Sequence, residues 1–165
     1  MPRYWIDSSV FITSKDTMFA FDIHKSFWAW MDGALRRGDV GCPRYVFKEI
    51  VENVRVEDAL AKWIKSRKRN SLHIEPNEDV YAALKKVTQY LFKSGRYKQE
   101  FALDFVKYAD PWIIAYAMGY GGKIVTQESG TQDLAARVFI PDVCNKFDIK
   151  CVKVWDMLRE LDVKL

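Results

Sequence analysis

The stretch ADPWIIAYAMGYGGKIVTQES, from Ala109 to Ser129, determines the fold of this chain. Asp110 followed by Pro111 predicts the start of a helix, because an Asp side chain can accept from free backbone N–H groups and Pro at the first helical position removes no needed donor. The residues that follow are almost all apolar until a cluster of glycines, so we expect a helix buried on most sides. A short buried strand is predicted from Lys123 to Thr126, and it ends just before Glu128. This unit places one carboxylate at the start of a core helix and another beyond the end of a core strand.

Two other acids stand at similar positions. The apolar run Tyr4 to Ile6 predicts a strand, and Asp7 follows it directly. In an open α/β sheet the ligand site lies outside the carboxyl ends of the strands, so Asp7 and Glu128 meet at one edge if their strands are parallel neighbours. Glu49 lies in a predicted helix that follows a short strand, Val40 to Cys42. Glu52, nearly one helical turn further on, competes with Glu49 for the same role, and Asp110 taken alone could be only a helix cap.

These residues together resemble the PIN domain family, and the resemblance is closest to the VapC-like toxin nucleases and their relatives. Its motifs are Asp7 with Ser9 after the first strand, the Pro-x-x-Val-x-x-Glu-Ile pattern that ends at Ile50, Asp110 before Ile-Ile-Ala-x-Ala, and the strand Ile-Val-Thr-x-Glu that ends at Glu128. The last acid is usually Asp in such proteins, whereas here it is a glutamate. The resemblance implies an RNA substrate, an antitoxin protein that blocks the site, and homodimerisation.

The carboxylates themselves predict a metal site. Three or four carboxylates within a few ångströms cannot all stay ionised in a dry pocket, so they need a cation. Ligand sets made only of oxygen favour Mg²⁺ or Mn²⁺, and such a metal activates water for hydrolysis of a phosphodiester. The expected assignments are two principal ligands (Asp7 and Asp110), two further acids acting directly or through water (Glu49 and Glu128), and two hydroxyl residues that orient the carboxylates (Ser9 and Thr126).

Composition indicates one globular domain over residues 1–165. The chain is 49% hydrophobic and 15% aromatic, which argues against disorder. Its net charge of +4 is compatible with a polyanionic partner but does not require one. We expect a cytoplasmic protein, because the sequence has neither the apolar core of a signal peptide nor an apolar run long enough to span a membrane.

Several other chemistries are disfavoured. Cys42, Cys144 and Cys151 are odd in number and lack a Cys-x-x-Cys spacing, so they are expected to be reduced core residues. His24 and His73 are the only histidines, and they match neither a zinc site nor a catalytic triad. The glycines near residue 120 end a helix rather than begin one, which argues against a phosphate-binding loop.

The remaining pattern alternates helices with short apolar strands. Such alternation predicts a parallel sheet covered on both faces, a three-layer α/β/α sandwich of the PIN-like type. Phe101, Phe105 and Tyr108 recur at helical spacing and are expected to lie in the core rather than to form a platform for stacked bases. Residues from Val138 to Ile140 are expected to form a short strand or an extended piece, and Asp104 is an additional candidate acid.

A basic run lies at the end of the helical stretch that begins at Arg44. Its residues Lys65, Arg67, Lys68 and Arg69 could follow an RNA backbone, but a charged run is more often a solvated helix face. Two alternatives to a ribonuclease remain open. One is a PIN-like module that binds RNA or protein without cutting, and the other is a structure-specific DNA nuclease, which would use the same metal chemistry.

Overall fold

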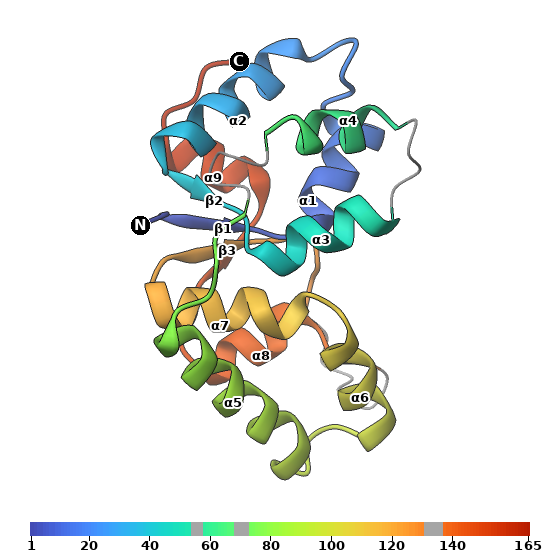
Figure 1. Cartoon of the computed structure of the whole chain (residues 1–165), viewed down its shortest axis with the longest axis vertical. Helices are drawn as coiled ribbons and strands as arrows, with labels where there is room; N and C mark the ends of the chain where they lie inside the picture. Colours follow the sequence, from blue (N-terminus) through green and yellow to red (C-terminus); the bar gives the residue numbers. More distant parts are fainter. Residues whose placement is uncertain (54–57, 68–72, 131–136) are drawn as a thin grey trace.

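The computed structural model describes residues 1–53, 58–67, 73–130 and 137–165, and these residues form an α/β fold around a parallel sheet (Figure 1). The sheet has four strands in the order β2-β1-β3-β4. Their bounds are β1 (Tyr4–Ile6), β2 (Val40–Gly41), β3 (Lys123–Val125) and β4 (Cys151–Val152). The predicted strand Tyr4 to Ile6 has the expected bounds, whereas the strands predicted at Val40 to Cys42 and Lys123 to Thr126 each end one residue earlier.

Every pairing in the sheet is parallel. Tyr4 of β1 lies opposite Val40 of β2 on one side and opposite Lys123 of β3 on the other. β1 and β3 are thus immediate neighbours with the same direction, and their carboxyl ends share one edge. This register brings the residues after β1 next to the residues after β3, as the sequence predicted.

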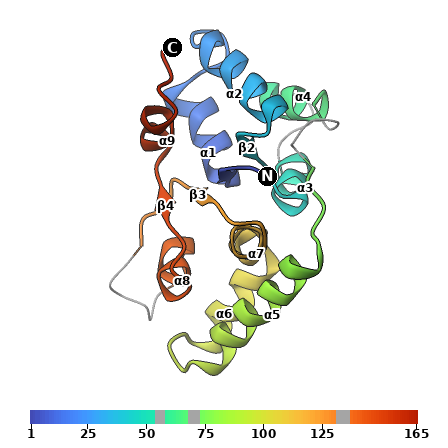
Figure 2. The ribbon, with the colours of Figure 1, turned by 90° about the vertical axis from the view of Figure 1, so that its left-hand side faces the viewer.

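Helices cover both faces of the sheet, and Figures 1 and 2 show the resulting three layers. The layer of α5, α6, α7 and α8 lies on one face, and α1, α2, α4 and α9 lie on the other. Helix α3 lies at the side and contacts α1 and α4 as well as α7. The bounds are α1 (Ser8–Thr13), the π-helix η1 (Ser14–Met18), α2 (Lys25–Arg37), α3 (Arg44–Asn53), α4 (Ala59–Lys65), α5 (Glu78–Lys93), α6 (Gln99–Lys107), α7 (Asp110–Tyr120), α8 (Ile140–Lys146) and α9 (Val154–Glu160).

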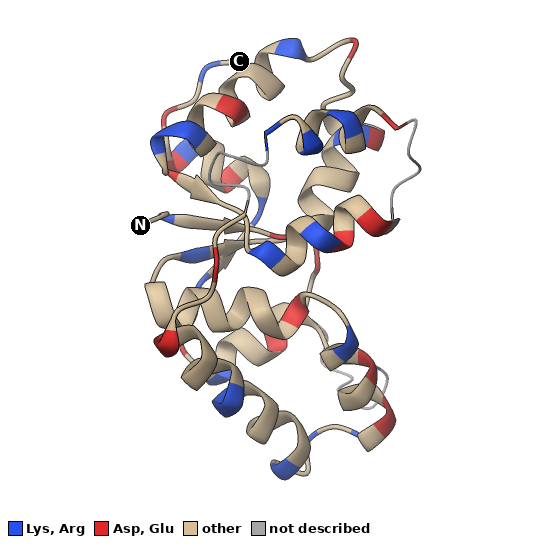
Figure 3. Ribbon diagram, viewed as in Figure 1, with Lys and Arg blue, Asp and Glu red and all other residues tan. Residues whose placement is uncertain are grey.

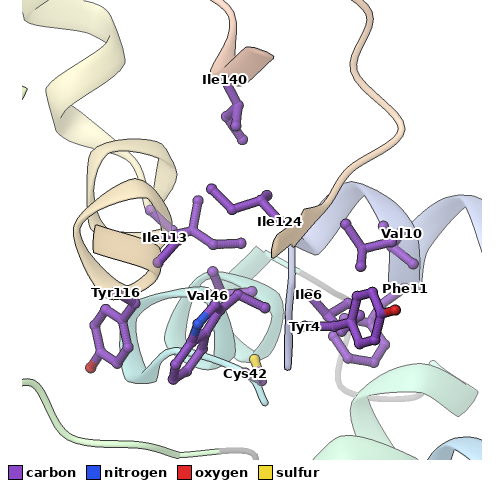
Figure 4. Packing of buried hydrophobic residues seen from close by; sticks show 14 of the residues in the cluster. Tyr4, Ile6, Val10, Phe11, Cys42, Val46, Ile113, Tyr116, Ile124 and Ile140 are labelled. Atoms are coloured by element: carbon purple, nitrogen blue, oxygen red, sulfur yellow. The ribbon is translucent and has the colours of Figure 1, made fainter. Parts of the chain in front are cut away.

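Helix α7 is the central helix of the core. Its residues from Ile113 to Ala117 are all buried, as its apolar sequence predicted. In Figure 4, Ile113 of α7, Ile124 of β3 and Ile140 of α8 point toward one another. Gly119 allows α5 to approach closely, since an added Cβ would lie 2.7 Å from the backbone nitrogen of Val80. The acid at the start of α7 is therefore anchored to a rigid element.

The structure differs from the sequence predictions at three places. A short helix, α1, and the π-helix η1 follow Asp7 directly, where no helix was predicted. Residues Val138 to Ile140 form no strand, because Ile140 already begins α8.

The third difference is Tyr108, which was predicted to lie in the core. Phe105 is 4% exposed, as expected, whereas Tyr108 is 51% exposed. The reason is that α6 ends at Lys107 and Tyr108 adopts an extended backbone, so the helical spacing no longer applies to its side chain.

The three cysteines lie in or near the core, as the sequence predicted. Cys42 and Cys144 are buried and Cys151 is partly buried, and all three are free thiols. Within the described ranges, no helix is both long and apolar enough to cross a membrane.

Candidate active site

An open cleft of about 550 Å³ lies at the edge of the sheet where β1 and β3 end. All four acids predicted from the sequence line it, and Figure 3 shows acidic segments on both helical layers at this side of the sheet. The described residues that line the cleft are Asp7, Ser8, Ser9, Ile12, Thr13, Glu49, Asp104, Tyr108, Asp110, Glu128 and Arg137.

Asp7 is the most deeply buried of the four acids, with 3% of its surface exposed. Both Ser9 and Thr126 donate a hydroxyl hydrogen bond to Asp7 Oδ2, the latter at 2.9 Å. Burial raises the pKa of Asp7, and these two hydrogen bonds oppose the rise because they stabilise the carboxylate. Asp7 is therefore fixed in orientation and costly to ionise without a nearby cation.

The two hydroxyl residues also tie together the chain segments that follow β1 and β3. Ser9 Oγ accepts from the backbone N–H of Gln127 at 3.1 Å, and Thr126 Oγ1 accepts from the backbone N–H of Glu128 at 3.1 Å. Each hydroxyl thus links the Asp7 carboxylate to the backbone after β3. This arrangement suits residues that orient an acid.

Asp110 is the first residue of α7, and Ala109 occupies the capping position before it. The side chain of Asp110 makes no capping hydrogen bond, so capping does not explain an acid at this position. Among the described residues, no donor forms a hydrogen bond to its carboxylate. Asp110 therefore faces the cleft with its acceptor capacity unused.

Glu49 reaches the cleft from α3. Its Oε2 accepts from the backbone N–H of Ala109 at 3.1 Å, and its Oε1 accepts from the Ser8 hydroxyl at 3.2 Å. The carboxylate thus caps the start of α7, where the helix dipole favours negative charge. The pKa of Glu49 is nevertheless raised, chiefly by burial and further by repulsion from Asp7.

Glu52 does not take the place of Glu49. Its side chain is 60% exposed and pairs with Lys48 at 3.7 Å, and it is absent from the described lining of the cleft. Glu49 and Glu52 are neighbours on the surface of α3, but Glu49 accepts a hydrogen bond at the start of α7, whereas Glu52 pairs with the exposed Lys48.

Glu128 lies on the opposite wall. Its Oε2 accepts from the backbone N–H of Ile140 at 2.8 Å, at the start of α8, and its Oε1 pairs with Arg137 at 3.3 Å. Burial is the main reason that the pKa of Glu128 is raised, and Arg137 opposes the rise. The side chain of Glu128, which is longer than that of an aspartate, thus connects the wall of the cleft to the start of α8.

The four acids are electrostatically coupled. The pKa of Asp110 is raised to about 8, first by burial and then by repulsion from Asp7, Glu128 and Glu49. Arg137 is the one cation that lowers it among the causes identified, and the side chain of Arg137 is 61% exposed. The cleft therefore holds more negative charge than its own cations neutralise.

This donor set fits a hard divalent cation in its chemistry but is not preassembled. Carboxylate and hydroxyl oxygens are ligands that Mg²⁺ and Mn²⁺ accept. In the part of the chain that the structure describes, however, no three acidic, histidine or cysteine side chains are grouped as a metal site. Glu49 and Glu128 line the cleft, but each already accepts a backbone hydrogen bond at the start of a helix, α7 or α8.

The described residues of the basic run, Lys65 and Arg67, are not part of the lining of the cleft. Arg67 donates to Asp32 at 2.6 Å and lies over the ring of Trp63, so its guanidinium already has partners within the fold. Lys65 is exposed at the end of α4, and Lys68 and Arg69 lie outside the described residues. The described lining of the cleft includes no residue of α4.

Sequence reasoning gave no role in the site to five described residues that line the cleft: Ser8, Ile12, Thr13, Tyr108 and Arg137. Arg137 lies nine positions after Glu128 in a segment without a recognisable motif, so only the fold brings it to the cleft. Tyr108 was assigned to the core by its spacing, and the end of α6 exposes it instead. Asp104, the uncertain acid, does line the cleft, where it also pairs with Lys107 at 3.5 Å.

Comparisons with known proteins agree with this architecture. The family described as "Domain of unknown function (DUF4411)" matches residues 4–165. The crystal structure of FitAcB from Neisseria gonorrhoeae is similar with a TM-score of 0.54 and 17% sequence identity, and the match covers 92% of this chain and 98% of that chain. FitAcB has a PIN fold, so the PIN-like fold predicted from the motifs is confirmed. No curated protein sequence matches this chain significantly.

Proposed function

We propose that this chain, which belongs to the DUF4411 family, is a metal-dependent endoribonuclease that hydrolyses RNA phosphodiester bonds. The observation that supports this proposal most strongly is the convergence of Asp7, Glu49, Asp110 and Glu128 on one cleft at the carboxyl edge of a parallel sheet. Burial, and after it repulsion from the other three acids, raises the pKa of Asp110 to about 8, and a bound cation would relieve this repulsion.

Asp7 and Asp110 would hold the cation. Asp7 is fixed by two hydroxyls, and Asp110 has a carboxylate without a hydrogen-bond donor among the described residues. Glu49 and Glu128 would take part through water, because their carboxylates already accept backbone hydrogen bonds at the starts of α7 and α8. When bound, Mg²⁺ or Mn²⁺ supplies an activated water and stabilises charge on the phosphate oxygens.

The protein side chains set the geometry of the reaction. Ser9 and Thr126 hold Oδ2 of Asp7 in one orientation, and Oδ1 accepts from the Ser8 hydroxyl at 3.5 Å. Arg137 lies at the rim with an exposed guanidinium and can pair with a phosphate oxygen in place of Glu128. The cleft offers no cysteine or serine activated by a histidine among its described lining, so hydrolysis by water is favoured over a covalent enzyme intermediate.

RNA is proposed as the substrate because of the resemblance to VapC-like nucleases. FitAcB is a toxin–antitoxin complex with a PIN domain, and this supports a role as the toxin of such a pair, with an antitoxin protein as partner. Homodimerisation belongs to the same proposal. The alternatives are a PIN-like module that binds without cutting and a DNA nuclease. One cleavage assay distinguishes both from the proposed ribonuclease.

The test is cleavage of labelled RNA and DNA by the purified protein with Mg²⁺, with Mn²⁺ and with a chelator. We expect metal-dependent cleavage of RNA and a loss of at least about a hundredfold in rate for Asp110→Asn, since Asn keeps the size of Asp but not its charge. Asp79→Asn is the matched control, because Asp79 is also an acid in the first turn of a helix, α5, but it is exposed and outside the described lining of the cleft, so this variant should cut as the parent does. RNA binding without cleavage by the parent would favour the binding module, and preferential cleavage of DNA would favour the second alternative.

A further inference from the structure

A second groove, of about 380 Å³, adjoins the acid cleft. It lies between α3, the end of α6 and the start of α7. Tyr108 and Glu49 line both the groove and the cleft, so the two hollows share a wall. A chain bound across the cleft would therefore extend directly into this groove.

Aromatic rings line the groove. Tyr45 of α3 stacks on Trp112 of α7 with ring centroids 3.7 Å apart and planes at 14°. Tyr108 lies at the junction with the cleft and is 51% exposed, and none of the ring contacts found among the described residues involves it. An exposed ring without a stacking partner, beside a rigid aromatic pair, is a surface on which a planar group can stack.

The charged residues of the groove are weakly paired. Lys48 pairs with Glu52 at 3.7 Å and Lys107 pairs with Asp104 at 3.5 Å, and all four side chains are at least 60% exposed. Pairs of this kind contribute little to stability, so a phosphate can replace the acid as the partner of either lysine. Because Glu52 and Glu49 also line the groove, its charge is nearly balanced. A groove with so little net positive charge suits a single nucleotide, with its base and phosphate, better than a long stretch of phosphate backbone.

We propose that this groove is the subsite for an unpaired nucleotide next to the phosphate that is cut, with Tyr108 as the residue on which its base stacks. The inference rests on the proposed function for the position of the cut. Stacking on an aromatic ring requires a base that is free of its own duplex partner, so the subsite selects single-stranded segments. Lys48 and Lys107 then contact the phosphates of that segment. The substrate class is thereby narrowed to unpaired regions.

The first experiment measures binding of short labelled oligonucleotides to the full chain in chelator, where no cleavage occurs. The probes are single-stranded RNA, single-stranded DNA of the same sequence, and an RNA duplex. We expect Tyr108→Ala to weaken binding of single-stranded RNA by roughly 5- to 100-fold, and to change duplex binding much less. Tyr108→Phe retains the ring and should bind as the parent does. Phe92→Ala, which removes an exposed ring of α5 outside the groove, is the matched control.

The second experiment measures the salt dependence of the same binding. Lys48→Gln and Lys107→Gln should each reduce the slope of log affinity against log salt by about 0.7. Lys93→Gln is the control, because Lys93 also lies in the last turn of its helix, but in α5. Equal slopes for the Lys107 and Lys93 variants would overturn the phosphate contact.

Unchanged binding of single-stranded RNA by Tyr108→Ala would overturn the subsite, and so would an equal loss in Phe92→Ala. The absence of any affinity for unpaired nucleotides in the parent would overturn it as well, and would leave the groove to a protein partner. If Tyr108→Ala weakens the binding of single-stranded RNA and of single-stranded DNA by similar factors, the groove binds the base and does not contact the 2′-hydroxyl. Binding that depends on Tyr108, without cleavage in any metal, would support the subsite and overturn the proposed function instead.

Discussion

The acid cleft and the aromatic groove share Tyr108 and Glu49 but differ in what holds their side chains. In the cleft, Asp7 is buried and its carboxylate is fixed by the hydroxyls of Ser9 and Thr126. In the groove, Lys48 and Lys107 are largely exposed and only loosely paired. The cleft is therefore electrostatically strained, whereas the groove is not.

Because of this difference, substitutions in the acid cleft and substitutions in the aromatic groove should change different measurable properties. A buried like-charge cluster makes the stability of the protein depend on pH and on cations, since both change the charge of the cluster. Exposed rings and weak ion pairs affect stability little, so their substitution changes the affinity for a ligand instead. Each of the following predictions tests this separation.

The largest expected effect is a fall in stability with rising pH when the protein is kept in chelator. The pKa of Asp110 is about 8 in the folded protein and near its ordinary value of 3.8 in the unfolded chain. Between these values the folded state holds a proton that the unfolded state has released, so stability is lost as pH rises through this window. The difference between the two pKa values corresponds to a ceiling of roughly 5 kcal/mol.

Thermal unfolding of the parent and of Asp110→Asn in chelator, from about pH 5 to about pH 8, measures this effect. The melting temperature of the parent should fall across the range, and that of Asp110→Asn should fall less. Asp104→Asn provides the control, because it removes an acid at the exposed rim of the same cleft. Parallel curves for the parent and Asp110→Asn would contradict the electrostatic account of the cluster.

The second effect is stabilisation by metal. A cation that binds only the folded state at about a hundred times its dissociation constant stabilises it by roughly 3 kcal/mol, which corresponds to roughly 5 to 10 °C for a domain of this size. Asp7→Asn should gain much less from Mg²⁺ or Mn²⁺, and without metal it should melt no lower than the parent because one repulsive charge is gone. The comparison is made at matched ionic strength to remove general screening. Equal shifts in both proteins would exclude the proposed ligands.

Much of this fold could be predicted from the sequence because a few local signals were strong. Asn is a preferred residue type at the start of a helix, and the side chain of Asn77 accepts from the backbone N–H of Val80 at the start of α5. Gly is the preferred residue type just beyond the end of a helix, and Gly38 has a φ of 77° after Arg37. The parallel pairing of β1 and β3 followed from the alternation of helices and strands. Helix α1 was missed because its six residues are too few to show a helical period.

The candidate site was predictable in its acids but not in their partners. The positions of Asp7 and Glu128 after two strands needed only the topology of the sheet to bring them together. The hydrogen bonds of Glu49 and Glu128 to the starts of α7 and α8 depend on where those helices pack, and no local pattern specifies this. Arg137 likewise lies near Glu128 because of how the chain packs, which no local pattern specifies. The exposure of Tyr108 depended on the last residue of α6, and helix ends are the least predictable positions in a sequence.

The third prediction concerns the hydroxyls that hold Asp7. Thr126→Val keeps the shape of the side chain but removes the donor to Asp7 Oδ2 and the acceptor for the backbone N–H of Glu128. We expect metal affinity to fall by roughly 10- to 100-fold, as is typical when a residue that orients a ligand is lost. Titration of Mn²⁺ followed by thermal shift measures it. Thr126→Ser, which retains the hydroxyl, should recover most of the affinity, and failure of this recovery would mean that packing rather than orientation is lost.

The smallest effect is expected from the basic run, whose described residues Lys65 and Arg67 line neither the acid cleft nor the aromatic groove. Lys65 ends α4 as Lys107 ends α6, so Lys65→Gln and Lys107→Gln remove the same charge from the same helical position. If the groove is the subsite, Lys65→Gln should change RNA affinity less than about twofold and leave the salt slope unaltered, while Lys107→Gln lowers the slope. Arg67→Gln should instead lower the melting temperature, because Arg67 pairs with Asp32 and covers Trp63. A larger loss of slope for Lys65→Gln than for Lys107→Gln would move the RNA path from the aromatic groove to α4 and would restore the basic run as the contact with the phosphate backbone.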